Sequence, residues 1–275
     1  MSECFGKHYI KNGQVLDSSE FCDGLINRGT SLYEVIRIID SVPIFLERHL
    51  ERLKNSAKIV NLELWMSLEE IKINLINLIK VNQIGEGNIK IIFNYDEEKV
   101  FLAYFIPHHY PTDSEYENGV SAILCFNERN NPNAKIINTE LRELTDKKIK
   151  ESGAYEAILV DRNNNITEGS RSNIFMVKGD SVLTAPLSEV LPGITREIII
   201  EICKEDNIKF FEKKVNYNEI SELDGLFITG TSPKVLPINK INDFVFDSSA
   251  NIVVQNIVRH YNRIIKDYIK FNKNN

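Results

Sequence analysis

The 275-residue chain has few of the residues that mark several common classes of protein. It contains four cysteines, Cys4, Cys22, Cys125 and Cys203, without paired spacing. We therefore expect neither a zinc site nor a disulfide framework, and a reducing cytoplasm is the expected compartment. The sequence shows no basic segment followed by an apolar one near its start, and no run of about 18 apolar residues. We accordingly expect no signal peptide and no membrane partner.

The chain also has fewer positively charged than negatively charged residues. Lys and Arg total 33 against 39 Asp and Glu, which gives a net charge of -6, and no long basic run is present. This balance argues against a nucleic-acid partner. The hydrophobic fraction of 43% and the charged fraction of 26% are ordinary for a soluble globular protein. A chain of this length can bury a large core in one large or two modest domains.

Strand and helix patterns alternate along the chain, which predicts an α/β (α+β) fold. Asn12-Gly13 is typical of a hairpin turn. Ser67, with Glu70 three residues later, predicts a capped helix start. A long helix is expected over residues 249–268, whereas residues 107–118 are polar and poorly periodic.

One segment interrupts these patterns. Residues 127–133 are rich in Asn and Pro and indicate a surface loop. We therefore expect an N-terminal α/β domain over residues 1–126, an interdomain loop over 127–133 and a C-terminal domain over 134–275.

Two segments of the second half point to a particular ligand. Thr167-Glu168-Gly169-Ser170 places one carboxylate in a turn of small residues that leads into an apolar strand. Pro192-Gly193 stands at the start of a helix, where free backbone N–H groups and the dipole attract an anion. The two lie about 25 residues apart. They suit a ligand with a phosphate at one end and a basic nitrogen at the other. Pyridoxal phosphate is such a ligand, and Lys135 is a candidate for the lysine it needs.

Each of these residues also has an ordinary interpretation when taken alone. Lys135 precedes two isoleucines, where loss of hydration would lower the pKa of its amine and favour the nucleophilic form, but it could be a solvated loop lysine. Glu168 could be a surface glutamate, Gly230-Thr231-Ser232-Pro233 a simple turn, and Arg52 a solvated helix residue. Tyr33, in an apolar strand, could simply pack.

Together the segments resemble a known family, the class IV (fold type IV) pyridoxal-phosphate aminotransferases. This family includes D-amino-acid and branched-chain aminotransferases and aminodeoxychorismate lyase. The resemblance covers residues 12–241. Besides the segments above, it rests on Arg28-Gly29-Thr30-Ser31-Leu32-Tyr33-Glu34-Val35-Ile36-Arg37 and on Arg48-His49-Leu50-Glu51-Arg52-Leu53-Lys54-Asn55-Ser56-Ala57.

The resemblance implies a two-domain fold, small N-terminal and larger C-terminal, with the cofactor between the domains and a homodimer as the working form. It implies that Lys135 forms the lysine aldimine and carries the proton, and that Glu168 pairs with the pyridine nitrogen. The implied phosphate ligands are Arg52, Ile194, Thr195 and Thr231. Tyr33 would lie near cofactor and substrate, and Ser232 would bind the substrate carboxylate.

The implied activity is ping-pong transfer of an amino group between an amino acid, either D- or branched-chain, and a 2-keto acid. Two alternatives stay open at this point: a 4-amino-4-deoxychorismate lyase that eliminates pyruvate, and a non-catalytic cofactor-binding protein. The strand over residues 88–96 offers Lys90 where D-amino-acid aminotransferases carry an Arg-x-His pair. Arg171 and Arg28 are therefore further candidates for binding the substrate carboxylate.

Overall fold

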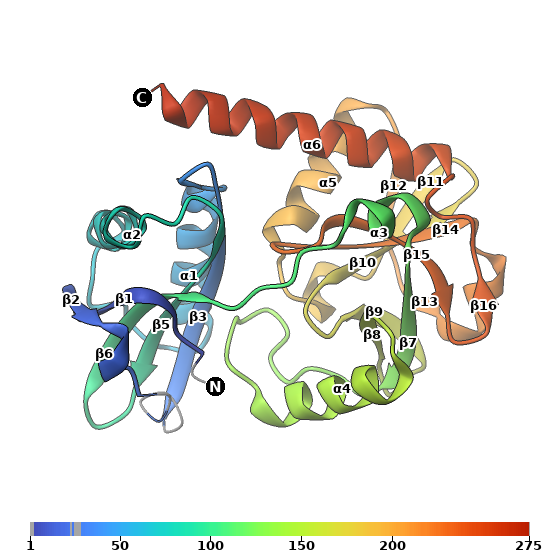
Figure 1. The fold of residues 1–275 in the computed structure, drawn as a ribbon. Coiled ribbons are helices and arrows are strands. Elements are labelled where there is room, and N and C mark those ends of the chain that lie inside the picture. Colours follow the sequence, from blue (N-terminus) through green and yellow to red (C-terminus); the bar gives the residue numbers. More distant parts are fainter. Residues whose placement is uncertain (1–2, 23, 25–28, 275) are drawn as a thin grey trace. The chain divides into compact units, whose positions relative to one another are not determined.

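The computed structural model describes residues 3–22, 24 and 29–274, and these form two compact units. The first comprises Met1–His109, Ala134–Ile137 and Ile265–Asn275, and the second Tyr110–Asn133 and Asn138–Ile264. Figure 1 shows the elements of each unit. The division differs from the predicted boundaries at 126 and 133, because the segment around Lys135 joins the first unit and residues 110–126 join the second.

The described residues of the first unit form a six-stranded antiparallel sheet, two complete α-helices and the end of the chain's last helix. Its order is β2-β1-β6-β5-β3-β4, and the predicted Asn12-Gly13 turn joins β1 to β2. The strands are β1 Phe5–Lys11, β2 Gln14–Asp17, β3 Thr30–Ile39, β4 Val42–Pro43, β5 Gly87–Tyr95 and β6 Lys99–Ile106. The helices are α1 Leu46–Ile59 and α2 Leu68–Asn82, and the predicted capping box of Ser67 and Glu70 begins α2. Both helices contact the sheet, α1 at β3 and α2 at β1 and β6.

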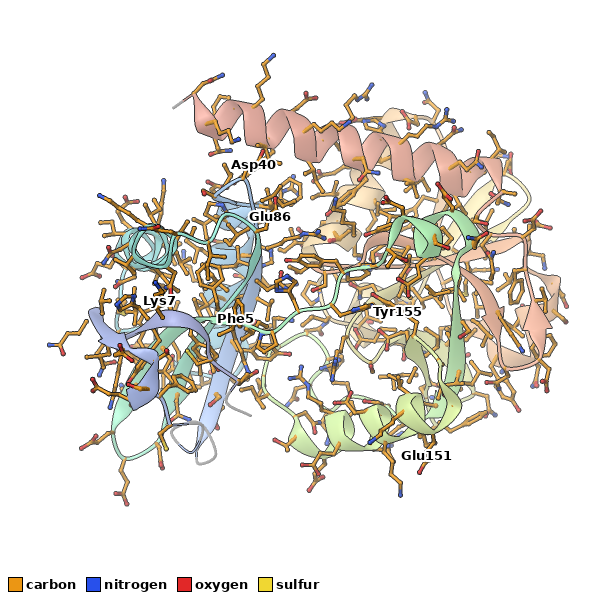
Figure 2. The ribbon with its side chains drawn as sticks, viewed as in Figure 1. Phe5, Lys7, Asp40, Glu86, Glu151 and Tyr155 are labelled. Atoms are coloured by element: carbon orange, nitrogen blue, oxygen red, sulfur yellow. The ribbon has the colours of Figure 1, made fainter. Side chains whose placement is uncertain are left out.

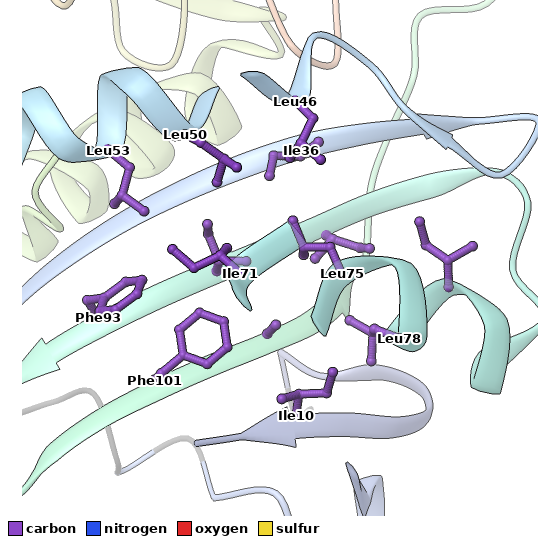
Figure 3. Packing of buried hydrophobic residues seen from close by; sticks show 14 of the residues in the cluster. Ile10, Ile36, Leu46, Leu50, Leu53, Ile71, Leu75, Leu78, Phe93 and Phe101 are labelled. Carbon is purple, nitrogen blue, oxygen red and sulfur yellow. The ribbon is translucent and has the colours of Figure 1, made fainter. Parts of the chain in front are cut away.

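The two faces of this sheet carry different residues. One face packs on α1 and α2 through a core of aliphatic and aromatic side chains, shown in Figure 3: Ile10, Ile36, Leu46, Leu50, Leu53, Ile71, Leu75, Leu78, Phe93 and Phe101. The other face is built around three tyrosines, Tyr9, Tyr33 and Tyr104. Because successive strand residues point to opposite faces, Lys90 shares the tyrosine face with its pairing partner Tyr104. The β3–β4 turn carries Asp40, whose backbone N–H donates to Glu86 (3.3 Å; Figure 2).

The second unit is a mixed ten-stranded sheet with four helices. Its order is β12-β11-β10-β14-β15-β7-β8-β9-β13, with β16 beside β15. The strands are β7 Val120–Phe126, β8 Glu156–Val160, β9 Asn165–Gly169, β10 Asn173–Lys178, β11 Ser181–Thr184, β12 Lys209–Glu212, β13 Val215–Asn216, β14 Gly225–Gly230, β15 Lys234–Ile241 and β16 Phe244–Val245. The helices are α3 Asp113–Asn118, α4 Thr139–Ser152, α5 Ile194–Glu205 and α6 Ile252–Lys273, the last of which continues into the first unit.

The central strands of the second unit close on themselves. β9 pairs with β10 through Glu168 and Asn173, so the path β10-β14-β15-β7-β8-β9 returns to its start as a barrel-like ring. Closure places Glu168 of β9 beside Asn173 of β10, which also pairs with Thr229 near the end of β14. None of the helices in the described part of the chain combines the length and apolar character that a membrane crossing requires.

Candidate active site

Lys135 lies on the edge of β3 in the first unit. Its carbonyl accepts the N–H of Tyr33 (3.2 Å), and the N–H of Ile137 donates to the carbonyl of Ser31 (3.2 Å). The N–H of Lys135 donates to the Ser56 hydroxyl of α1 (3.2 Å). These bonds explain why residues 134–137 join the first unit, although the sequence predicted them in the C-terminal domain. They also fix the backbone from which the Lys135 side chain extends.

The Lys135 amine lies over the ring of Tyr33, with Nζ 4.7 Å from the ring centroid. Tyr33 is only 7% exposed and belongs to the tyrosine face of the first sheet. The amine of Lys90 also lies over this ring, at 5.7 Å. The structure therefore brings together Lys135 and Tyr33, both predicted as site residues, and adds Lys90 as a second amine.

Arg52 is held on α1 by a buried carboxylate from β3. Glu34 accepts hydrogen bonds from Arg52 Nε (2.7 Å) and Nη2 (2.6 Å), and it lies 2.8 Å from His49 Nδ1. Burial would raise the pKa of Glu34, but Arg52 and His49 outweigh it and lower that pKa to about 2. Burial lowers the pKa of His49, against the opposing effect of Glu34. Glu34 thus fixes the orientation of the Arg52 guanidinium.

Glu168 is the last residue but one of β9, and its carboxylate is buried and anchored at both oxygens. Its Oε1 accepts from Arg129 Nε (2.9 Å), and its Oε2 accepts from the N–H of Leu191 (3.1 Å). Arg129 Nη2 also donates to the carbonyl of Ser170 (3.1 Å). Sequence reasoning missed Arg129, because it lies in the polar 127–133 loop and follows no periodic pattern.

The N-terminus of α5 is arranged to accept an anion. Gly193 is its N-cap residue and makes no side-chain capping bond, so no side chain at that position competes for the first N–H groups, among them those of Ile194 and Thr195. A Cβ on Gly193 would lie 2.0 Å from Asn173 Oδ1, so this approach requires glycine. The hydroxyl of Thr195 lies 3.3 Å from that of Tyr261.

A buried hydroxyl lies at the neighbouring strand end. Thr229 pairs directly with Asn173, so both side chains stand on the same face of the sheet, and Asn173 abuts Gly193. Thr229 Oγ1 is buried and has no hydrogen-bond partner in the described structure. Thr231 and Ser232 follow in the half-buried turn between β14 and β15. A buried donor without a partner beside a helix N-terminus fits a phosphate.

The two arginines predicted for substrate binding are placed differently. Arg171 donates from Nη2 to both oxygens of Asp146 on α4 (2.5 and 2.6 Å), with side chains 54% and 44% exposed. Arg171 therefore lies in a surface ion pair, and its substrate role stays a prediction. Arg28 lies outside the described residues.

Each unit, taken by itself, contains groups of the kinds that bind pyridoxal phosphate. The first unit contains an amine at Lys135 and a guanidinium at Arg52. The second contains a buried carboxylate at Glu168, a helix N-terminus at Ile194 and Thr195, and the Thr229 hydroxyl. The Lys135 amine can react with the cofactor's aldehyde, and the Glu168 carboxylate can accept the N–H of its ring. The other groups are hydrogen-bond donors for its phosphate. Among the described residues, no cluster of three His, Cys, Asp or Glu side chains could hold a metal ion.

Comparison with known proteins identifies the family. The family described as Amino-transferase class IV matches residues 31–241. The chain belongs to the class IV aminotransferases. It is 31% identical to the D-alanine aminotransferase of Bacillus licheniformis over 256 residues, 87% of this chain and 90% of that protein.

Solved structures of class IV aminotransferases share the fold. The branched-chain aminotransferase of Thermoproteus uzoniensis, solved with norvaline, superposes with a TM-score of 0.84 at 25% identity, covering 95% of both chains. The branched-chain aminotransferase of Thermobaculum terrenum in its PLP form superposes with a TM-score of 0.83 at 19% identity, covering 97% of this chain and 96% of that one. The fold is therefore that of the fold type IV aminotransferases, as the sequence predicted.

Proposed function

We propose that this class IV aminotransferase uses pyridoxal phosphate to move an amino group between a D- or branched-chain amino acid and a 2-keto acid. The observation that carries the proposal is the anchored Lys135, whose backbone is bonded to Tyr33 and Ser56 and whose amine lies over the Tyr33 ring. Pyridoxal phosphate, when bound, supplies an aldehyde that reacts with amines and a ring that accepts an electron pair.

The chain's own residues divide the remaining work. Lys135 would hold the cofactor through Nζ, and the same amine would carry the proton that leaves the substrate α-carbon. Glu168 would keep the ring nitrogen protonated, and Arg129 holds the Glu168 carboxylate in place. Arg52, the first N–H groups of α5 and Thr231 would bind the phosphate.

A carboxylate subsite is suggested by Lys90 and Tyr104. Lys90 is 3% exposed, and its amine donates to both oxygens of Glu3 (2.6 and 2.9 Å), one of which also accepts from the Tyr104 hydroxyl (2.9 Å). Glu3 is more exposed, at 35% of its side chain. We propose that a substrate carboxylate displaces Glu3 and takes its place on this amine and phenol. Ser232 would offer its backbone N–H to the same substrate.

We propose further that the chain acts as a homodimer in the cytoplasm. Exposed apolar side chains, such as Phe126 at 57% and Val245 at 76%, support an association surface. The four cysteines form no disulfide with one another in the described structure, which is compatible with a reducing compartment.

Replacement of Lys135 tests the activity. Lys135→Ala should lose transamination by about a factor of 1,000 or more, because it removes both the covalent bond and the proton carrier. The control is Lys147→Ala, since Lys147 is 74% exposed. Borohydride reduction of the wild-type holoenzyme should fix the cofactor on the peptide that contains Lys135. Cofactor on another lysine would contradict the proposal.

A panel of D- and L-amino acids with pyruvate or 2-oxoglutarate tests the reaction class. Aminotransfer predicts a new amino acid and parallel lines in double-reciprocal plots, because the first keto acid leaves before the second binds. Release of pyruvate from 4-amino-4-deoxychorismate, without amino transfer, would instead identify a lyase.

Replacement of Lys90 and Glu3 tests the carboxylate subsite. Lys90→Met should raise KM for the keto acid about tenfold with little change in kcat, and Glu3→Gln should lower that KM, because it removes the internal competitor. An unchanged KM in both variants would argue against the subsite.

A further inference from the structure

Glu156 is a buried carboxylate that the proposed reaction does not use. It opens β8, is 5% exposed and accepts four hydrogen bonds. Its Oε1 accepts from the N–H of Ala157 (2.8 Å) and from the N–H and hydroxyl of Ser170 (3.1 and 2.6 Å). Its Oε2 accepts from the hydroxyl of Ser172 (2.8 Å). Three of the four bonds therefore come from the turn that follows Glu168.

Backbone hydrogen bonds and close packing also hold this turn. The N–H of Gly169 donates to the carbonyl of Ser172 (2.7 Å), and the N–H of Ser170 also donates to the carbonyl of Ala157 (2.8 Å). A Cβ on Gly169 would lie 2.0 Å from Ser172 Oγ and 3.0 Å from Glu156 Oε2. The Glu156 carboxylate thus lies tightly against the Gly169 backbone, one residue after Glu168.

Arg129 contacts the same turn from another direction. It donates to the Ser170 carbonyl from Nη2 and to Glu168 from Nε. The Glu156 carboxylate holds the N–H and hydroxyl of Ser170, while Arg129 holds its carbonyl. Any loosening of Ser170 would therefore change the bond between Arg129 and Glu168.

We propose that Glu156 is a positioning residue, whose carboxylate fixes the Gly169–Ser172 turn and thereby the position of the Glu168 carboxylate toward the cofactor's ring nitrogen. The inference rests on the proposed role of Glu168. Burying a carboxylate costs folding free energy, and well-packed apolar residues in its place would stabilise the interior equally well or better. Its four donors offset that cost and give a fixed geometry, and misplacement by about 1 Å can lower a reaction rate about 100-fold.

The test compares Glu156→Gln and Glu156→Ala with a matched buried-network control. Ser248→Ala serves as that control, because the Ser248 hydroxyl is fully buried and bridges Leu226 and Ile238 in the same unit. Pyridoxal phosphate affinity of each apoenzyme is measured by fluorescence quenching. The protonation of the bound ring is read from the 15N shift of ring-labelled cofactor. Hydrogen exchange at the Ser170 amide reports on the turn without cofactor.

The proposal expects Glu156→Ala to weaken cofactor affinity about tenfold, to lower kcat about 10- to 100-fold, to shift the ring 15N signal toward the unprotonated form and to speed exchange at Ser170. Glu156→Gln, which keeps one acceptor, should recover part of each effect, and it replaces the alanine variant if that fails to fold. Ser248→Ala should move none of them. The proposal would be overturned if both Glu156 variants kept the ring protonation and the Ser170 exchange rate of the wild type.

Glu168→Gln separates this inference from the proposed function. If Glu168→Gln alone shifts the ring signal, the role of Glu168 stands and the role of Glu156 fails. If Glu168→Gln leaves the ring signal unchanged, the assigned role of Glu168 fails, and with it the premise of the inference.

Discussion

Glu34 carries a fully buried negative charge that two basic side chains of α1 surround. Replacing Glu34 with Gln removes that charge and leaves the Arg52 guanidinium buried without its counter-ion. We expect the free energy of unfolding to fall by about 3–5 kcal/mol, the usual effect of removing one partner of a buried pair. Urea denaturation followed by circular dichroism measures the change.

An exposed pair provides the comparison for Glu34. Lys178 and Glu222 are 47% and 57% exposed, so Lys178→Ala should change the free energy of unfolding by less than about 1 kcal/mol. If the two variants lose similar amounts of unfolding free energy, the burial of Glu34 does not strengthen its contribution to stability.

The burial of His49 and Glu34 also predicts how stability depends on pH. The pKa of His49 lies below its ordinary 6.5, chiefly because burial disfavours the imidazolium. Below pH 6.5 the unfolded chain therefore binds the proton more readily than the folded chain, and the free energy of unfolding falls. The pKa of Glu34 is lowered from 4.5 to about 2, so further stability is lost between those values as the pH falls. The free energy of unfolding should be lower at pH 5.5 than at pH 7.5.

His49→Gln isolates the first of these two effects. The amide can still donate to Glu34 but does not titrate, so this variant should lose less stability between pH 7.5 and 5.5 than the wild type does. An equal loss in both proteins would assign the dependence to other groups.

The sequence points to residues that stand in motifs, whereas residues that act through a partner leave no sequence signal. Lys135 and Glu168 could be proposed from the sequence, because the chemistry of one ligand links their separate segments, and their roles stay predictions. Arg129 and Glu156 could not, because their roles depend on contacts with Ser170 that only the folded chain creates. Lys90 was noted, but its partner Glu3 is 87 residues away in the sequence.

Glycine is required at position 193, the N-cap of α5, because a side chain there would collide with a neighbour and not because of the backbone conformation. Gly193 has φ -72°, which any residue adopts, but an added Cβ would lie 2.0 Å from Asn173 Oδ1. The Asn173 amide donates to the carbonyl of Leu191 (3.0 Å). Gly193→Ala should displace this side chain, lower the free energy of unfolding by about 1–3 kcal/mol and weaken cofactor binding. Thermal unfolding and cofactor titration of the apoenzyme measure both effects.

A second substitution shows whether Asn173 is the cause. Asn173→Ala in the Gly193→Ala background should recover part of the lost stability, with a coupling of about 0.5–3 kcal/mol. Gly225→Ala is the matched control, because its nearest contacts would be at an ordinary 3.5 Å. Additive effects of the two substitutions would locate the strain elsewhere.

Elements with local signals were predicted well, and those that depend on distant partners were not. The Asn12-Gly13 turn and the Ser67 capping box are encoded within a few residues, and both are present. Residues 113–118 form α3, a single short helix capped by Thr112 and Glu115 that is too brief to show periodicity. The last helix was predicted to end at 268 but continues to Lys273, where its final residues contact the first unit.

The chain passes between its two units more than once, which explains why the domain boundaries could not be read from composition. Residues 134–137 and 265–275 join a unit whose other residues lie far away in the sequence. A linear reading divides a chain at a polar loop such as 127–133, whereas the hydrogen bonds of Lys135 to β3 assign its segment by contact.

The end of α6 therefore supports the first unit. Tyr268 contacts the ring of Phe45 (centroids 5.0 Å apart) and donates to Glu47 (2.7 Å), and Ile265 is 5% exposed. Removal of residues 265–275 should lower stability by about 2–5 kcal/mol, because it uncovers these apolar contacts. Hydrogen exchange should quicken in α1 and leave β14 protected, and Tyr268→Phe, which loses only the hydroxyl, should cause a much smaller change. Faster exchange confined to the second unit would contradict this assignment of the helix end.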